Sequence, residues 1–143
     1  MERIKINLPE HFSFSTKIAI RITDMNYGGH VGNDSFLTLI HEARQQFLQH
    51  YGYSELNMEG VGLIMTDAAI EFKKELTYGD ALTIYVTARG FDKLGFDIYY
   101  LLETEHNGVK AIAGKAKTGM LCFDYALKKK VVVPEQAVQK LSA

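Results

Sequence analysis

The chain has 143 residues, and its hydrophobic fraction of 47% can build the core of one ordinary domain without a disulfide or a metal. Sixteen basic residues against seventeen acidic ones leave a formal charge of -1, so no global field attracts nucleic acid or an anionic membrane. The single cysteine, Cys122, excludes an intrachain disulfide and a multi-cysteine metal site, and we expect no metal. Neither an apolar leader nor an apolar run near about 18 residues is present, which predicts a cytoplasmic protein.

The first predicted element is a strand, because residues 12–23 are rich in β-branched side chains that roughly alternate. A polar, glycine-rich loop follows. Beyond it the apolar positions recur every three or four residues, which predicts one amphipathic helix over about residues 34–51. Asn33 or Asp34 is the expected N-cap, and Gly52 is expected to end the helix in a left-handed conformation.

Everything after this helix is predicted to be β structure, with strands over residues 63–75, 81–89, 96–103 and 109–123. Asn107-Gly108 is the strongest hairpin signal, because a type I′ turn needs a positive φ at both central positions. Tyr78-Gly79-Asp80 and residues 92–95 mark the other two reversals. Such short connections favour antiparallel neighbours, so we expect a meander of four strands.

Together these elements predict an α+β domain over residues 1–143, with one long helix against an antiparallel sheet of about five strands. A single helix covers only one face of a sheet. The strands are nevertheless apolar on both faces, as in residues 99–102. We therefore expect a homo-oligomer that covers the remaining surface.

The loop at residues 23–34 joins the first strand to the helix and is the best candidate for a functional site. Its three glycines let backbone N–H groups approach a ligand closely at a helix N-terminus near Asn33. Such a terminus stabilises a negative oxygen, either on a bound anion or on a developing oxyanion. The loop matches neither the dinucleotide-binding glycine fingerprint nor a phosphate loop.

Four side chains of this loop carry possible chemistry. Asp24 and His30 are candidate acid–base groups, and Asn26 and Asn33 are neutral hydrogen-bonding groups. An oxyanion site beside a carboxylate or an imidazole suits acyl transfer or hydrolysis. The alternative is that these residues only form turns between strand and helix, with His30 filling space.

The order of residues over 21–44 is an aspartate, a glycine, His30-Val31, Asn33, the aromatic Phe36 and Glu42-Ala43-Arg44. In this order the segment resembles the opening of the hot-dog acyl-CoA thioesterases of the 4-hydroxybenzoyl-CoA thioesterase type. The resemblance continues through residues 70–74 and 78–80 and ends at residues 133–135. It implies a hot-dog fold, a homodimer or homotetramer, and hydrolysis of a small-molecule acyl thioester of coenzyme A or acyl carrier protein, with no cofactor besides the coenzyme A of the substrate.

The resemblance places the thioester carbonyl at the helix start, with the backbone N–H of Asn33 as oxyanion donor and His30 beside it. The family often has a catalytic aspartate four residues before this histidine, where this chain has Asn26. An amide cannot take a proton from water, so Asn26 only orients a reactant, or another carboxylate supplies the base. Gly32 and Phe36 are milder departures, from asparagine and tyrosine.

Three carboxylates are candidates for the missing base. Asp24 matches the first aspartate of the family pattern, but it also suits bonding to backbone amides. Asp67 interrupts an apolar stretch, so it needs a hydrogen-bonded partner or a raised pKa, unless it is exposed or caps a loop. Glu42 lies on the far side of the helix from Asn33, and a pair with Arg44 or with another chain is expected instead.

Lys73 and Lys74 are candidates to bind the coenzyme A phosphates, as is Lys93, although lysines on a strand edge also serve to discourage aggregation. Residues 128–130, three lysines, are expected to form a solvated turn. Two other functions are open. Asn26 favours a non-catalytic module that binds acyl thioesters, and an enoyl-CoA hydratase on the same fold would need a paired aspartate and histidine.

Overall fold

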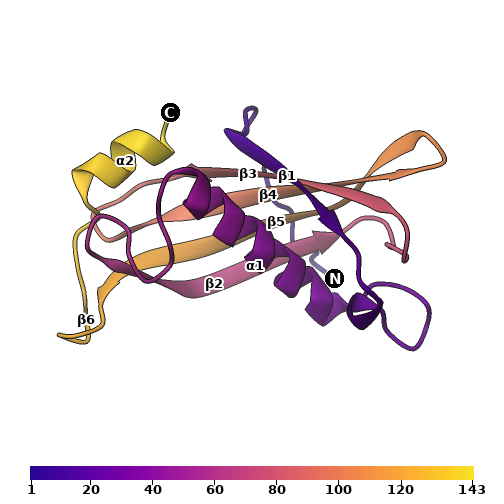
Figure 1. Cartoon of the computed structure of the whole chain (residues 1–143), viewed down its shortest axis with the longest axis horizontal. Coiled ribbons are helices and arrows are strands. Elements are labelled where there is room, and N and C mark those ends of the chain that lie inside the picture. Colours follow the sequence, from indigo (N-terminus) through magenta and orange to yellow (C-terminus); the bar gives the residue numbers. More distant parts are fainter.

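The computed structural model describes residues 1–143, and in it a long helix, α1 (Asn33–His50), lies across one face of a six-stranded antiparallel sheet (Figure 1). The strands are β1 (Phe14–Ala19), β2 (Gly62–Phe72), β3 (Ala81–Arg89), β4 (Gly95–His106), β5 (Val109–Asp124) and β6 (Lys129–Lys130). Two short helices complete the fold, the 3-10 helix η1 (Ile22–Asp24) and α2 (Glu135–Leu141). The predicted α+β class is confirmed. No helix combines the length and the apolar character needed to cross a membrane.

The sheet has the strand order β1-β3-β4-β5-β2, with the short β6 beside β5. The hairpin predicted at Asn107-Gly108 is confirmed, because these residues have φ values of 51° and 78°. The predicted four-strand meander is wrong, since β2 pairs with β5 and not with β3. Segment 73–80 instead leads from β2, at one edge of the sheet, to β3, which lies next to the strand at the other edge. Leu76 of this segment is fully buried in the core. The predicted turn at its end is therefore part of a crossover.

Helix α1 packs against the sheet through a continuous apolar face. Its buried apolar side chains are Phe36, Leu39, Ile40, Ala43, Phe47 and Leu48. They join one core cluster with inward-facing residues of β3 and β4, such as Ile84 and Ile98. Burial of each large apolar side chain stabilises the fold by roughly 1.5–3 kcal/mol. This packing fixes the position of the helix N-terminus relative to the sheet.

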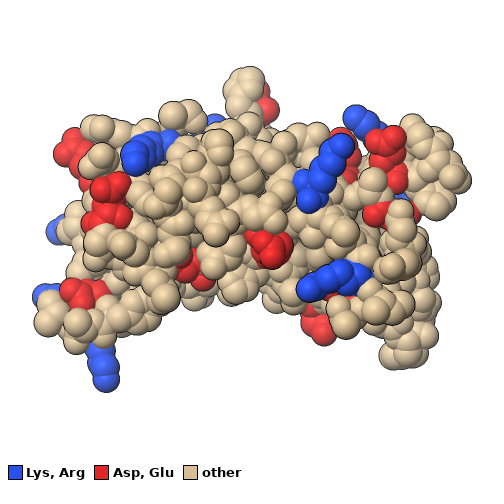
Figure 2. Space-filling view, in the orientation of Figure 1, with Lys and Arg blue, Asp and Glu red and all other residues tan.

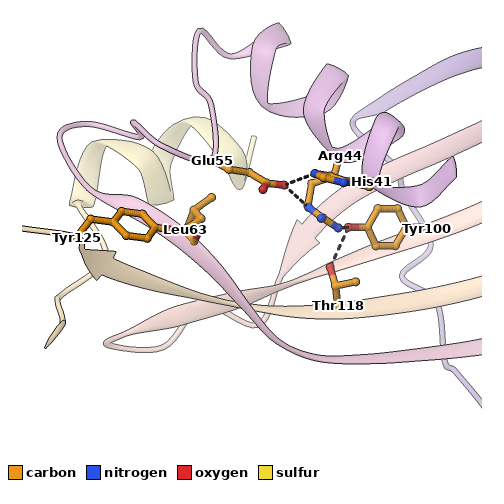
Figure 3. A network of polar contacts seen from close by, with 7 residues as sticks. All are labelled: His41, Arg44, Glu55, Leu63, Tyr100, Thr118 and Tyr125. Carbon is orange, nitrogen blue, oxygen red and sulfur yellow. Dashed lines mark hydrogen bonds and ion pairs between the residues drawn. The ribbon is translucent and has the colours of Figure 1, made fainter. Parts of the chain in front are cut away.

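A partly buried ion pair also ties α1 to its surroundings (Figure 3). The Arg44 side chain is 7% exposed, and its Nε lies 2.7 Å from Oε1 of Glu55 in the loop after the helix. It also donates from Nη1 to the hydroxyl of Tyr100 on β4, at 3.3 Å. Burial raises the pKa of Tyr100, which keeps this hydroxyl neutral. The expected pair of Glu42 with Arg44 is wrong, because Glu42 lies on the exposed face of the helix and accepts from Gln46. The alternative pair of Glu42 with another chain stays a prediction.

The ends of α1 differ in part from the prediction. The N-cap is Gly32, which has no side chain to cap the helix, so Asn33 and Asp34 lie in the first turn instead of capping it. Gly52 adopts a φ of 80° after the helix, which confirms the predicted left-handed stop.

The chain after β5 also differs from the prediction of β structure alone. Pro134 is the N-cap of α2, whose Ala137 and Leu141 are buried against the core. The seven residues of this helix are too few for a clear apolar period. The lysines at 128–130 are exposed, and Lys129 and Lys130 form β6.

The sheet face opposite α1 is partly covered by the chain's own N-terminal segment. The Ser13 and Thr87 hydroxyls lie 3.4 Å apart at β3, whereas the N–H of Ile6 donates to Glu71 on β2. Because β3 and β2 are separated by two strands, residues 6–13 must cross this face (Figure 1). Thr87 is fully buried as a result. Part of the apolar second face is thus covered without another copy of the chain.

Candidate active site

The glycine loop is shaped by the side chain of Asn26. Its Oδ1 accepts the N–H of Gly28 at 2.8 Å and the N–H of His30 at 3.3 Å. The N–H of Asn26 in turn donates to the carbonyl of His30 at 2.7 Å. Gly29 has a φ of 82°, a conformation that favours glycine. Asn26 therefore fixes the conformation that presents His30.

The loop is fastened to segment 73–80, which is distant in sequence. The N–H of Val31 donates to the carbonyl of Leu76 at 2.8 Å. The N–H of Gly32 donates to the carbonyl of Asp24 at 3.1 Å, which closes the loop at the entry of the helix. The crossover between β2 and β3 therefore forms a second wall beside the loop.

The N-terminus of α1 keeps two donors unused. The N–H groups of Ser35 and Phe36 donate to the carbonyl of Gly32, at 3.0 and 3.3 Å. The N–H groups of Asn33 and Asp34 find no acceptor within the protein. Free N–H groups and the positive end of the helix dipole together favour a negative oxygen at this position. The expected oxyanion site is thus geometrically available.

A cavity of about 350 Å³ opens at this helix terminus. Its lining residues are Asn26, Gly28, His30, Val31, Asn33, Phe36, Phe72, Lys73, Lys74 and Glu75. The rings of Phe36 and Phe72 meet edge to face at 4.9 Å and give it an aromatic wall. A larger hollow of about 510 Å³ lies between β1 and α1, and Glu42 is the only one of the candidate residues that lines it. Five predicted residues thus meet in one cavity: Asn26, His30, Asn33, Lys73 and Lys74.

Glu75 is a cavity residue that the sequence did not reveal. Its Oε2 lies 3.0 Å from Nε2 of His30, and the two side chains are 74% and 40% exposed. Glu75 follows the predicted phosphate-binding lysines in sequence, which is the only local signal for it. Glu75 lies beside the glycine loop because segment 73–80 crosses the sheet. The predicted four-strand meander contains no such crossover, so it could not place Glu75 there.

Asp24 does not line this cavity. It is 3% exposed, and Oδ2 accepts the N–H of Arg21 at 2.8 Å, while Oδ1 lies 3.3 Å from Nη2 of the same residue. The carboxylate thus closes the short helix η1 before the loop.

Asp67 also lies apart from the cavity, beside an irregularity in the pairing of β2 with β5. Its Oδ1 accepts from Nζ of Lys117 at 2.9 Å and from the N–H of Gly119 at 3.1 Å. The hydrogen bond from Lys117 lowers the pKa of Asp67 and outweighs the opposing effect of burial, and the Gly119 amide lowers this pKa further. The Asp67 side chain is 62% exposed, so the alternative of an exposed strand position is confirmed, a hydrogen-bonded partner is also present, and the raised pKa is wrong.

The two cavity lysines differ in their partners. Nζ of Lys73 lies 3.0 Å from Oε2 of Glu71, whereas Lys74 makes no ion pair. Figure 2 shows charges of both signs scattered over the α1 face, with no broad region of one sign. An anionic ligand must therefore be bound by local cations, as the net charge already implied.

The sequence of residues 20–141 matches the thioesterase-like superfamily. The chain is 27% identical over 119 residues to a 1,4-dihydroxy-2-naphthoyl-CoA hydrolase of Microcystis aeruginosa, covering 81% of this chain and 83% of the relative. The fold is similar to that of a 1,4-dihydroxy-2-naphthoyl-CoA thioesterase from Synechocystis, with a TM-score of 0.77, 23% identity and coverage of 90% and 93%. It is also similar to a mutant 4-hydroxybenzoyl-CoA thioesterase complexed with 4-hydroxybenzoyl-CoA, with a TM-score of 0.79, 16% identity and coverage of 90% and 97%.

The helix laid across an antiparallel sheet has the hot-dog fold of these thioesterases. The chain belongs to the thioesterase-like superfamily, and it is a thioester hydrolase. The family, the fold and the class of reaction predicted from the sequence are confirmed.

Proposed function

We propose that the chain hydrolyses an acyl-CoA thioester at the N-terminus of α1. The observation that carries this proposal is the unused N–H group of Asn33 at the helix N-terminus, because Asn33 lines a cavity that also holds the imidazole of His30. The N–H of Asn33 stabilises the oxyanion of the tetrahedral intermediate, because the donor is already in place and needs no reorganisation. Water and the thioester are the only reactants, so coenzyme A enters as part of the substrate and no other cofactor takes part.

His30 is the proposed general base. It lines the cavity, whereas Asp24 and Asp67 are engaged elsewhere with Arg21 and Lys117. His30 takes a proton from water as the water oxygen attacks the carbonyl carbon. When the intermediate collapses, the carbon–sulfur bond breaks and the coenzyme A thiolate takes that proton, which leaves the free acid and the thiol.

An aromatic acyl group is the proposed substrate class. The support is the edge-to-face pair of Phe36 and Phe72 on the cavity wall, together with similar proteins named for naphthoyl-CoA and benzoyl-CoA substrates. Aromatic side chains favour edge-to-face or offset contacts with a further ring. We expect Phe72→Ala to raise KM for an aromatic acyl-CoA at least about fivefold and to change KM for acetyl-CoA less.

Lys74 is the proposed phosphate-binding residue, with Lys73 in a weaker role. Both lysines line the cavity, but the ammonium of Lys73 already has Glu71 as a partner. A cation without a protein partner gives up less on binding a phosphate.

A second copy of this chain is the proposed partner, in a homodimer or homotetramer. The support is that β2 forms an edge of the sheet, and that Met65 and Phe72 on it are 47% and 51% exposed. Long edge strands with apolar side chains are rarely left uncovered. Light scattering after size exclusion tests this, and a monomer at micromolar concentration would contradict it.

Thiol release measures the proposed reaction directly. The protein is mixed with benzoyl-CoA, a phenylacyl-CoA, acetyl-CoA or a long-chain acyl-CoA, and free thiol is followed with a thiol reagent. We expect release with an aromatic substrate, a fall of at least about 100-fold in His30→Ala, and rates near wild type in Asp24→Asn and Asp67→Asn. Binding in calorimetry without thiol release would instead indicate the non-catalytic module.

A further inference from the structure

We infer that Glu75 is a positioning residue that holds His30 in its catalytic orientation, an inference that rests on the proposed hydrolysis. The chain lacks a carboxylate at position 26, and Glu75 is the only carboxylate among the residues that line the cavity. Because Glu75 contacts His30, its carboxylate influences the reaction through the imidazole, without itself contacting the substrate.

The geometry assigns a role to each nitrogen of the His30 ring. Nε2 lies 3.0 Å from Oε2 of Glu75, which is ion-pair distance, and the negative charge of this carboxylate favours a proton on Nε2. Nδ1 then carries the lone pair and makes no hydrogen bond within the protein. The charge of Glu75 therefore favours the tautomer that accepts a proton from water at Nδ1.

The backbone holds these two side chains together. The N–H of Val31 bonds the carbonyl of Leu76, so the residues just before them, His30 and Glu75, are brought side by side. His30 is held further through its N–H and its carbonyl, both of which bond Asn26. The contact thus follows from how the loop and segment 73–80 are joined.

The pair of Glu75 and His30 adds little to the stability of the fold. Glu75 is 74% exposed and His30 is 40% exposed, and ion pairs in such surroundings add little to the stability of a fold. A carboxylate that orients a histidine has a larger effect on catalysis, because it sets the tautomer and stabilises the imidazolium as it forms. A Glu75 variant without the carboxylate is therefore expected to fold normally and to hydrolyse the thioester more slowly.

Glu75→Gln removes the charge and keeps the size of the side chain. We expect kcat for benzoyl-CoA to fall at least about tenfold, with KM changed less than about threefold and the melting temperature unchanged. Glu75→Asp retains the carboxylate and is expected to recover part of kcat. Glu135→Gln, on α2 at the opposite end of the molecule (Figure 1), is the matched control and is expected to keep full activity.

A double mutant shows whether Glu75 acts through His30. In a His30→Ala background, measured by single turnover at high enzyme concentration, we expect Glu75→Gln to cost less than about twofold. Wild-type kcat in Glu75→Gln, or an equal loss in both backgrounds, would overturn the positioning role while leaving hydrolysis intact. A wild-type protein that releases no thiol from any acyl-CoA would instead overturn the proposed function, and this inference with it.

Discussion

The side-chain carbonyl of Asn26 accepts the N–H of Gly28 at 2.8 Å, so the residue in the expected aspartate position shapes the loop that holds His30. A carboxylate oxygen can accept the same bond. We expect Asn26→Asp to fold like the wild type and keep at least its kcat/KM. Asn26→Ala loses the acceptor and should lower kcat/KM at least about tenfold in the thiol-release assay. Equal rates in all three proteins would show that this bond does not control the site.

Lys74 should matter for coenzyme A and not for the acyl group. Lys74→Ala is expected to raise KM for benzoyl-CoA about fivefold or more at low salt, and to leave hydrolysis of benzoyl-N-acetylcysteamine unchanged, because that thioester carries no phosphate. Lys73→Ala is the matched control with a smaller expected effect, since Glu71 already neutralises Lys73. A larger rise in KM for Lys73→Ala than for Lys74→Ala would contradict this assignment.

Removing one partner of the Arg44–Glu55 pair should destabilise the fold, because the other charge is then left unpaired. Glu55→Ala strands a guanidinium that is 7% exposed, and we expect the free energy of unfolding in urea to fall by about 2–3 kcal/mol. Glu42→Ala on the exposed face of α1 should change it by less than about 0.5 kcal/mol. Arg44→Met in the Glu55→Ala background should restore part of the loss, and a further loss would contradict this explanation.

Asp80 should make the free energy of unfolding depend on pH in the acidic range. Burial alone would raise the pKa of Asp80, but hydrogen bonds from Thr77 and the contact with His106 outweigh it and lower the pKa below the unfolded value of 3.8. A lowered folded pKa stabilises the fold above about pH 4, and this contribution disappears as pH falls through the folded pKa. We expect Asp80→Asn to be less stable than wild type at pH 7 and the difference to shrink toward pH 2.5 in urea titrations. A difference that does not change with pH would contradict this.

Local signals predicted most of the fold but not the path of segment 73–80. The hairpin at Asn107-Gly108 depends on adjacent residues with positive φ, and the limits of α1 depend on its apolar period. The pairing of β2 with β5 instead joins residues distant in sequence, as does the burial of Leu76 in the core. Such contacts between distant residues leave no pattern in the local sequence, so they could not be predicted from it.

The same distinction applies to the site. Asn26, His30 and Asn33 lie in one loop and could be recognised together, whereas Glu75 reaches His30 only through tertiary structure. Asp67 interrupts an apolar run and therefore drew attention as a possible base. Its partner Lys117 is on the adjacent strand, where only the strand register places it.

The central claim is that the backbone N–H of Asn33 holds the oxyanion, and a proline at this position removes that N–H together with the asparagine side chain. Asn33 is the first residue of α1, where proline is favoured, and Gly32 has a ψ of 154°, which suits a residue before proline. Asn33→Ala is the matched control, because it loses the same side chain but keeps the N–H. We expect Asn33→Pro to keep its melting temperature and to show kcat at least about 100-fold below that of Asn33→Ala. Equal kcat values in two folded variants would contradict the claim.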